Sequence, residues 1–202
     1  MSYIDDLEEM TQQRFIVGIG SSAGGLQALM TFFDFTPHDS ATYILLRHTP
    51  REYQSCLIDI MKKHSKLEFI EAANAMPLAK DKVYFPPTGM HMTITNDTLY
   101  LQKRSLSALY PNHAVDIFFN SLALDKGSNG IAVVLSGTGS DGTRGITAVK
   151  NAGGMTIAQE PESCGYPQMP RNAINTGNID HILRPPDMPR HILKYITKRL
   201  ST

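Results

Sequence analysis

The strongest constraint on the fold is the alternation of continuous apolar runs with stretches of amphipathic, helix-like sequence. Runs such as residues 15–19 and 131–135 lack the apolar–polar alternation of a strand with one face in water. Strands of this kind are typical of a parallel sheet that helices cover on both faces. The expected strands are residues 15–19, 43–46, 67–70, 83–85, 131–135 and 155–158, and the expected helices are residues 26–33, 54–64, 114–126, 143–151 and 189–200.

One stretch departs from this pattern. Residues 90–95 and 98–101 alternate between apolar and polar side chains, and Asn96-Asp97 between them has the composition of a tight turn. We therefore predict an α/β fold with a mostly parallel sheet, helices on both faces and an antiparallel hairpin at one edge.

Length and charge limit the classes of protein that fit. A chain of 202 residues is long enough for one domain with its own core. We expect an acidic lead over residues 1–13 and one folded domain over residues 14–202. The 19 basic and 19 acidic residues give a formal net charge of zero, which argues against a nucleic-acid partner.

Cysteine usage and targeting signals point to a compartment. Cys56 and Cys164 form neither a disulfide framework nor a metal-ligand spacing, which is typical of a reducing environment. No apolar segment is long enough to span a membrane, and the acidic start lacks the features of a secretion signal. The sequence predicts a soluble, cytoplasmic protein that is not integral to a membrane and holds no metal.

Residues 20–24, with the sequence GSSAG, lie between an expected strand and an expected helix. The spacing G-x-S-x-G is typical of a turn that exposes a serine hydroxyl, here that of Ser22, at the edge of a sheet. The first N–H groups of the following helix would be free to donate to a developing oxyanion. The glycines Gly18, Gly20 and Gly24 also imitate a dinucleotide-binding loop, so this segment alone leaves both interpretations open.

A nucleophilic serine needs a base and a group that orients the base. His48 comes just after the expected strand 43–46, which places it at the same sheet edge as Ser22. Asp141 lies in a glycine-dense segment after the expected strand 131–135 and would reach the same edge. Asp141 also has the residue type and position to cap the helix that follows it.

The three candidates occur along the chain in the order Ser22, His48, Asp141. The α/β-hydrolases have the order serine, acid, histidine, so the sequence predicts a hydrolase with a different α/β fold. Of the other histidines, His91 and His113 lie near expected loop entries and are candidates for supporting the site.

Six ordered segments carry a resemblance to a known family. They are residues 19–25 (IGSSAGG), 47–50 (RHTP), 83–87 (VYFPP, with His91), 115–119 (VDIFF), 135–142 (LSGTGSDG) and 169–174 (MPRNAI). From about Phe15 to Pro186 the chain resembles the CheB-type methylesterases, which remove methyl groups from chemoreceptor glutamates.

The resemblance implies a catalytic domain that hydrolyses glutamate γ-methyl esters on the cytoplasmic helices of chemoreceptors, and that also deamidates particular glutamines. It implies no cofactor. Carried over by motif, Ser22 is the nucleophile, His48 is the base and Asp141 orients the base. The backbone N–H groups of Ala23 and Thr138 are the expected oxyanion donors.

Met169 is expected, by the same resemblance, to line the pocket. Two positions depart from the family pattern: Thr138 stands where methionine is common, and Arg47 stands where glutamine is usual. A cation facing the site would disfavour protonation of the base. Arg47 therefore either points away from the site or meets a carboxylate of the substrate.

The family's catalytic domain usually follows a receiver domain, and residues 1–13 are too short to hold one. We therefore expect that the chain is a piece of a larger regulator or that another partner controls it. A receiver domain and a methyltransferase are the regulatory partners considered.

Two other functions stay open on the sequence. The glycine pattern together with Arg47 would suit an NADP-binding domain, although no acidic residue ends the second expected strand. A receptor-binding module whose catalysis has decayed is the other alternative, and the intact serine, histidine and aspartate argue against it.

Overall fold

The structure is a computed structural model, and it describes residues 14–38, 41–47, 54–104 and 113–201. A seven-stranded sheet forms its centre, in the strand order β10-β9-β8-β1-β2-β5-β3. Every neighbouring pair in this sheet is parallel. Its strands are β1 (Ile16–Ser21), β2 (Thr42–Arg47), β3 (Glu68–Glu71), β5 (Lys82–Phe85), β8 (Gly130–Val134), β9 (Met155–Gln159) and β10 (His181–Leu183).

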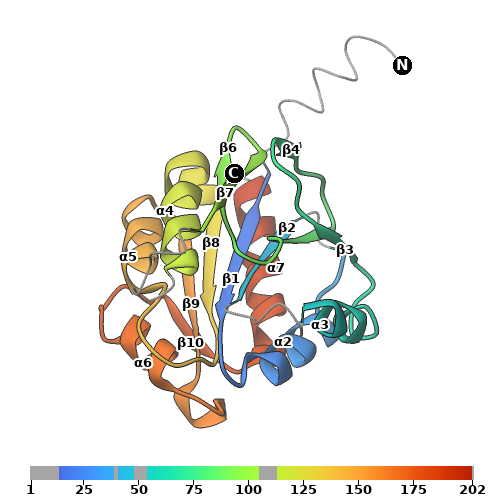
Figure 1. The fold of residues 1–202 in the computed structure, drawn as a ribbon. Helices are drawn as coiled ribbons and strands as arrows, with labels where there is room; N and C mark the ends of the chain where they lie inside the picture. The colour runs from blue at the N-terminus through green and yellow to red at the C-terminus, as the bar shows by residue number, and fades with distance from the viewer. Residues whose placement is uncertain (1–13, 39–40, 48–53, 105–112, 202) are drawn as a thin grey trace.

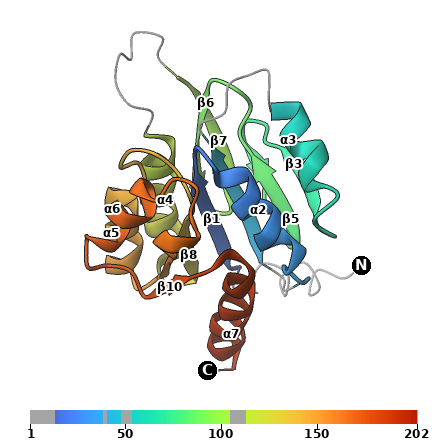
Figure 2. The ribbon, with the colours of Figure 1, turned by 90° about the horizontal axis from the view of Figure 1, so that it is seen from below.

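Helices cover both faces of the sheet (Figures 1 and 2). On one face Val17 and Ile19 of β1 belong to a core with Phe32 of α2. On the other face Ile16 belongs to a second core with Phe118 of α4. The first face carries α2 (Gly25–Asp34), α3 (Gln54–Met61) and α7 (Met188–Leu200), and the second carries α4 (Ala114–Lys126), α5 (Thr143–Asn151) and α6 (Gln168–Ile174).

The predicted hairpin is present as β6 (Met90–Thr95) and β7 (Thr98–Lys103). Asn96 and Asp97 have φ values of 49° and 56°, as a tight hairpin turn requires. The hairpin pairs with β4 (Met76–Pro77) in a small antiparallel sheet instead of extending the parallel one. Its buried side chains belong to the same core as α4, so it widens that layer.

The expected fold class is confirmed, but one strand of the parallel sheet, β10, and one helix that packs on the sheet, α6, were missed. The strand β10 has only three residues, and its burial alternates instead of being continuous. The helix α6 has seven residues and carries Pro170 near its start. Both elements are too short for a pattern of apolar side chains to reveal them.

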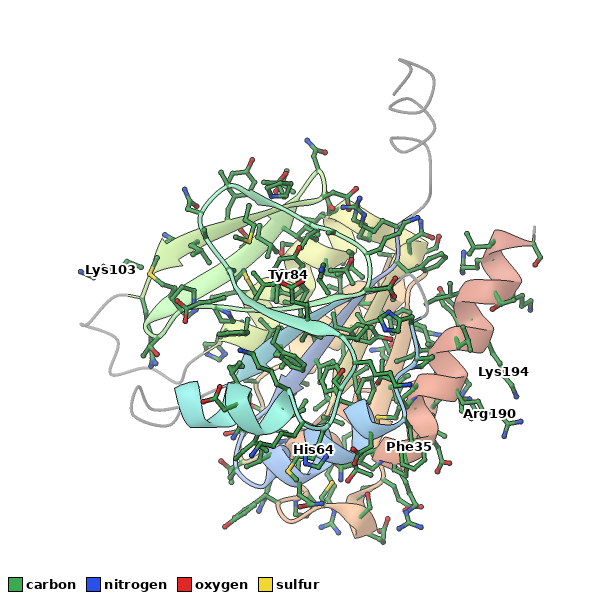
Figure 3. The ribbon with its side chains drawn as sticks, turned by 90° about the vertical axis from the view of Figure 1, so that its right-hand side faces the viewer. Phe35, His64, Tyr84, Lys103, Arg190 and Lys194 are labelled. Atoms are coloured by element: carbon green, nitrogen blue, oxygen red, sulfur yellow. The ribbon has the colours of Figure 1, made fainter. Side chains whose placement is uncertain are left out.

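The helix α7 closes the face that α2 and α3 also cover. Ile192 and Ile196 are buried in the core on that side, whereas Arg190 and Lys194 extend away from it (Figure 3). Among the described residues, no helix combines the length and the apolar character needed to cross a bilayer.

Candidate active site

Ser22 directly follows β1 and precedes α2, as the glycine-serine motif predicts. Its N–H donates to the carbonyl of Ser136 at 3.0 Å, and its carbonyl accepts the N–H of Gly25 at 3.0 Å. Gly24 closes the turn with a φ of 70°, a left-handed conformation that favours glycine. The strand ends at Ser21 and the helix begins at Gly25, so the serine stands on a short, tightly held turn.

The packing of α4 accounts for the two earlier glycines of the motif. A Cβ atom added to Gly18 would lie 2.8 Å from Cε1 of Phe119, and one added to Gly20 would collide with Cγ1 of Val115. Both glycines therefore allow α4 to approach β1 closely. The glycine pattern that suggested a dinucleotide-binding loop is thus explained without a nucleotide.

Met169 lies close to the serine turn. A Cβ atom added to Gly137 would collide with Sδ of Met169 and would lie 3.0 Å from Cβ of Ser22. The side chain of Met169 is buried, and its N–H donates to the carbonyl of Gly137 at 3.1 Å. The loop after β8 and the start of α6 therefore form one wall next to Ser22.

Ser136 ties three distant segments together behind this wall. Its Oγ donates to the carbonyl of Ala23 at 3.0 Å and accepts the N–H of Tyr166 at 3.0 Å. Its own N–H donates to Oε1 of Gln159 at 2.8 Å. Ser136 and Gln159 were not predicted as site residues; the only signal in the sequence was that each directly follows an expected strand that is wholly apolar or buried, residues 131–135 and 155–158.

Asp141 is buried at the same edge of the sheet, but it does not cap the helix that follows it. Its Oδ2 accepts the N–H of Val115 at 3.0 Å and its Oδ1 accepts the N–H of Asp116 at 2.9 Å, so it caps α4. The expected cap of α5 was wrong because Gly142, and not Asp141, is the residue that precedes the first turn of α5, and its φ of 95° directs the chain away from Asp141. In exchange, Oδ1 of Asp116 accepts the N–H of Gly145 at the start of α5, at 2.9 Å.

His113 and Arg144 flank this pair of carboxylates. Nδ1 of His113 lies 3.6 Å from Oδ2 of Asp116 and 4.0 Å from Oδ1 of Asp141, and Nε of Arg144 lies 3.6 Å from Oδ2 of Asp116. Burial raises the pKa of the Asp116 carboxyl, the N–H of Gly145 opposes the rise, and the charge of Asp141 adds to it.

The side chains of His113, Asp116 and Asp141 offer ligand atoms within 4.8 Å of one another, a grouping that could hold a metal ion. Both oxygens of Asp141 and one oxygen of Asp116 already accept backbone N–H groups. We therefore interpret the cluster as the anchor that joins the starts of α4 and α5.

His48, the predicted base, lies outside the described residues. The strand β2 ends one residue earlier at Arg47, which is the register partner of Ser21. Burial lowers the pKa of the Arg47 guanidinium, and its Nε has no hydrogen-bond partner within the described residues. Because alternate residues of a strand share a face, Arg47 is on the same face of β2 as Tyr43 and Leu45.

The turn that carries Thr138 is exposed to solvent. Nδ2 of Asn172, on α6, donates to the carbonyl of Gly139 at 2.7 Å and so anchors the turn. Within the described part of the chain, neither the N–H of Thr138 nor that of Ala23 donates a hydrogen bond.

Comparison with known proteins agrees with this geometry. The family model described as CheB methylesterase matches residues 17–192. The chain belongs to the CheB methylesterase family. The catalytic domain of the CheB methylesterase of Thermotoga maritima superposes with a TM-score of 0.82 at 28% identity, covering 91% of this chain and 99% of that domain.

Relatives of known sequence give the same result. The chain is 31% identical over 180 residues to a protein-glutamate methylesterase/protein-glutamine glutaminase of Chromobacterium violaceum, covering 88% of this chain and 50% of that protein. The chain is also 29% identical over 189 residues to a protein of the same name from Thiobacillus denitrificans, covering 92% of this chain and 53% of that protein. It is also 39% identical over 143 residues to an uncharacterized 104.1 kDa protein of Rhodobacter capsulatus, covering 71% of this chain and 15% of that protein. The chain spans about half the length of the two named methylesterases.

Proposed function

We propose that this chain is a protein-glutamate methylesterase that hydrolyses glutamate γ-methyl esters on the cytoplasmic helices of chemoreceptors, and that it also deamidates particular glutamines. The observation that carries the proposal is the position of Ser22, on a tight turn that ends directly at the start of α2. Relatives over most of the chain bear the name of this activity. We assign residues 1–13 as a lead and residues 14–202 as the catalytic domain.

Ser22, His48 and Asp141 are the proposed catalytic triad. His48 takes the proton of the Ser22 hydroxyl as the oxygen attacks the ester carbonyl. The C–O bond to the methoxy group breaks, and the imidazole returns the proton to the departing methanol. Water then repeats the attack on the acyl-enzyme, which releases the glutamate carboxylate and restores the serine.

The N–H groups of Ala23 and Thr138 are the proposed donors to the oxyanion. Ala23 is next to Ser22 at the positive end of α2, where backbone N–H groups favour negative charge. The carbonyls on both sides of the site are bonded, through Ser136 to Ala23 and through Asn172 to Gly139. This support preorganises the donors, and Met169 limits the space beside Ser22.

Asp141 is proposed to orient the base. Two backbone N–H groups hold its carboxylate in a fixed plane. A carboxylate fixed in this way keeps an imidazole in the tautomer that can accept the serine proton. The proposed cycle uses no cofactor.

The proposal places the reaction in the cytoplasm, because the substrates are cytoplasmic helices. A receiver domain and a methyltransferase are the regulatory partners that it includes.

The first prediction concerns Ser22 itself. Ser22→Ala should abolish methanol release from methyl-labelled receptor fragments, since no other group on the turn can form the acyl-enzyme. The matched control is Ser21→Ala: the Oγ of Ser21 is buried and has no hydrogen-bond partner within the described residues, so its loss should leave activity unchanged. Equal release by wild type and Ser22→Ala would refute the assignment. No release by wild type would favour the decayed receptor-binding module.

A further inference from the structure

An exposed aromatic side chain borders the proposed nucleophile. Tyr166 lies in the segment between β9 and α6, and 47% of its surface is exposed. A Cβ atom added to Gly24 would lie 2.9 Å from Cδ2 of Tyr166, so the edge of the ring lies over the turn that carries Ser22. The ring is therefore next to the serine turn and faces solvent over about half of its surface.

The backbone of Tyr166 is held rigidly in this place. Its N–H donates to Oγ of Ser136 at 3.0 Å, and its carbonyl accepts the N–H of Gly137 at 2.9 Å. Three residues further on, Met169 packs against the same loop. A tyrosine on a fixed backbone offers a large amphipathic contact surface at a small entropic cost, because little freedom remains to be lost on binding.

Among the described residues, the hydrogen bonds of Tyr166 are made by its backbone N–H and carbonyl, and none is made by its ring hydroxyl. The edge of the ring lies at Gly24, one residue beyond Ala23, the proposed oxyanion donor. It is therefore placed to touch the part of a substrate that remains outside the site.

We propose that Tyr166 is a specificity-determining residue that packs against the polypeptide flanking an esterified glutamate, and so favours protein-bound esters over small free esters. The inference rests on the proposed function and names how that site selects its substrate. A glutamate γ-ester extends from a chain on a flexible stem, so a protein substrate brings a backbone and neighbouring side chains to the mouth of the site. A small acetate ester brings only the reacting group and gains nothing from the ring.

The experiment compares two esters. Tyr166→Ala should raise KM for a methylated receptor fragment about tenfold while kcat stays unchanged, because aromatic anchors at interfaces are typically worth this much. Hydrolysis of p-nitrophenyl acetate should stay unchanged. Tyr166→Phe, which retains the ring, should keep the wild-type KM for the fragment.

The matched control is Tyr100→Ala. Tyr100 is exposed to a similar degree, 42%, but lies on β7 in the small antiparallel sheet. The Tyr100→Ala variant should hydrolyse both esters with the wild-type kinetic constants.

Each outcome decides the matter. If Tyr166→Ala lowered activity equally on both esters, the role of Tyr166 would be to stabilise the fold. If KM for the fragment did not change, the ring would not contact the substrate. Either result would overturn the inference, as would a Tyr166→Phe variant that behaves like the alanine variant. If wild type released no methanol from the fragment, the proposed function itself would fall, and this inference with it.

Discussion

At the scale of single residues, Gly137 is the position with the least room near the nucleophile. A Cβ atom added to Gly137 would collide with Sδ of Met169 and would lie 3.0 Å from Cβ of Ser22. A glycine is required here by close approach of side chains, whereas at Gly24 it is required by a left-handed backbone as well. Activity should therefore respond to changes at Gly137 that never touch the substrate.

Gly137→Ala is expected to displace Met169 and the Ser22 turn. Overpacking of this kind costs about 1–3 kcal/mol, and a misplaced nucleophile can lower kcat about a hundredfold. Thermal unfolding and methanol release measure the two effects.

Gly165→Ala is the control for the Gly137 variant, because an added Cβ there would meet only Cα of Gly24 at an ordinary 3.9 Å. It should unfold at the wild-type temperature. A Gly137→Ala enzyme with full kcat would show that the wall beside Ser22 adapts freely, contrary to the structure.

At the scale of elements, α4 and α5 are joined by an exchange of caps. Asp141, just before α5, accepts the first N–H groups of α4, and Asp116, in the first turn of α4, accepts an N–H at the start of α5. Each carboxylate therefore lies at the positive end of a helix, which favours its negative charge. The proposed orienting residue thus takes its position from two helices and not from one loop.

This exchange predicts a pH dependence of stability. Because the folded-state pKa of Asp116 is raised, mainly by burial, the unfolded chain ionises first as the pH rises. Stability therefore falls between the ordinary Asp pKa of about 4 and the higher folded-state pKa. Asp116→Asn keeps an oxygen for the N–H of Gly145 but has no proton to lose. Its free energy of unfolding, relative to wild type, should increase across that window.

Chemical denaturation at a series of pH values tests this difference. Arg144, His113 and Asp141 face the same carboxyl and are retained in both proteins, so the comparison isolates Asp116. Asp187→Asn, at an exposed position, serves as the control. A difference between Asp116→Asn and wild type that does not vary with pH would contradict the raised pKa.

The same two helices show what the sequence could and could not predict. Their positions followed from apolar periodicity, and Asp141 followed from its place after a buried strand. Its partners did not, because an aspartate before a helix normally caps that helix, and only tertiary structure shows that Gly142 turns the chain away. Short elements such as β10 and α6 also escaped, since three or seven residues carry no readable period.

At the scale of the whole molecule, the parallel sheet places the loops that follow its strands at one edge. Ser22 follows β1, Ser136 follows β8 and Tyr166 follows β9, and these three strands include two neighbouring pairs. The fold class predicted this convergence, because the carboxyl ends of parallel strands share an edge. What it did not predict is the polar group that fastens the loops together.

The polar group that links these loops is the side chain of Ser136, and the last prediction concerns its removal. Ser136 is buried, and Ser136→Ala would leave the partly buried carbonyl of Ala23 and N–H of Tyr166 without their partner, at a cost of about 1 kcal/mol or more. The loss should loosen all three loops at once, so kcat for both esters should fall along with the melting temperature.

Amide hydrogen exchange locates the effect, because the N–H of Tyr166 should exchange faster in the variant while the amides of α7 keep their protection. Ser140→Ala, which removes an exposed hydroxyl from the same loop, should change neither exchange nor activity. If Ser136→Ala lowered the melting temperature but left Tyr166 exchange and kcat at wild-type values, the hydroxyl would stabilise the fold without holding the site together. If it altered Tyr166 exchange and kcat together, the catalytic edge would depend on one buried side chain that links segments more than a hundred residues apart.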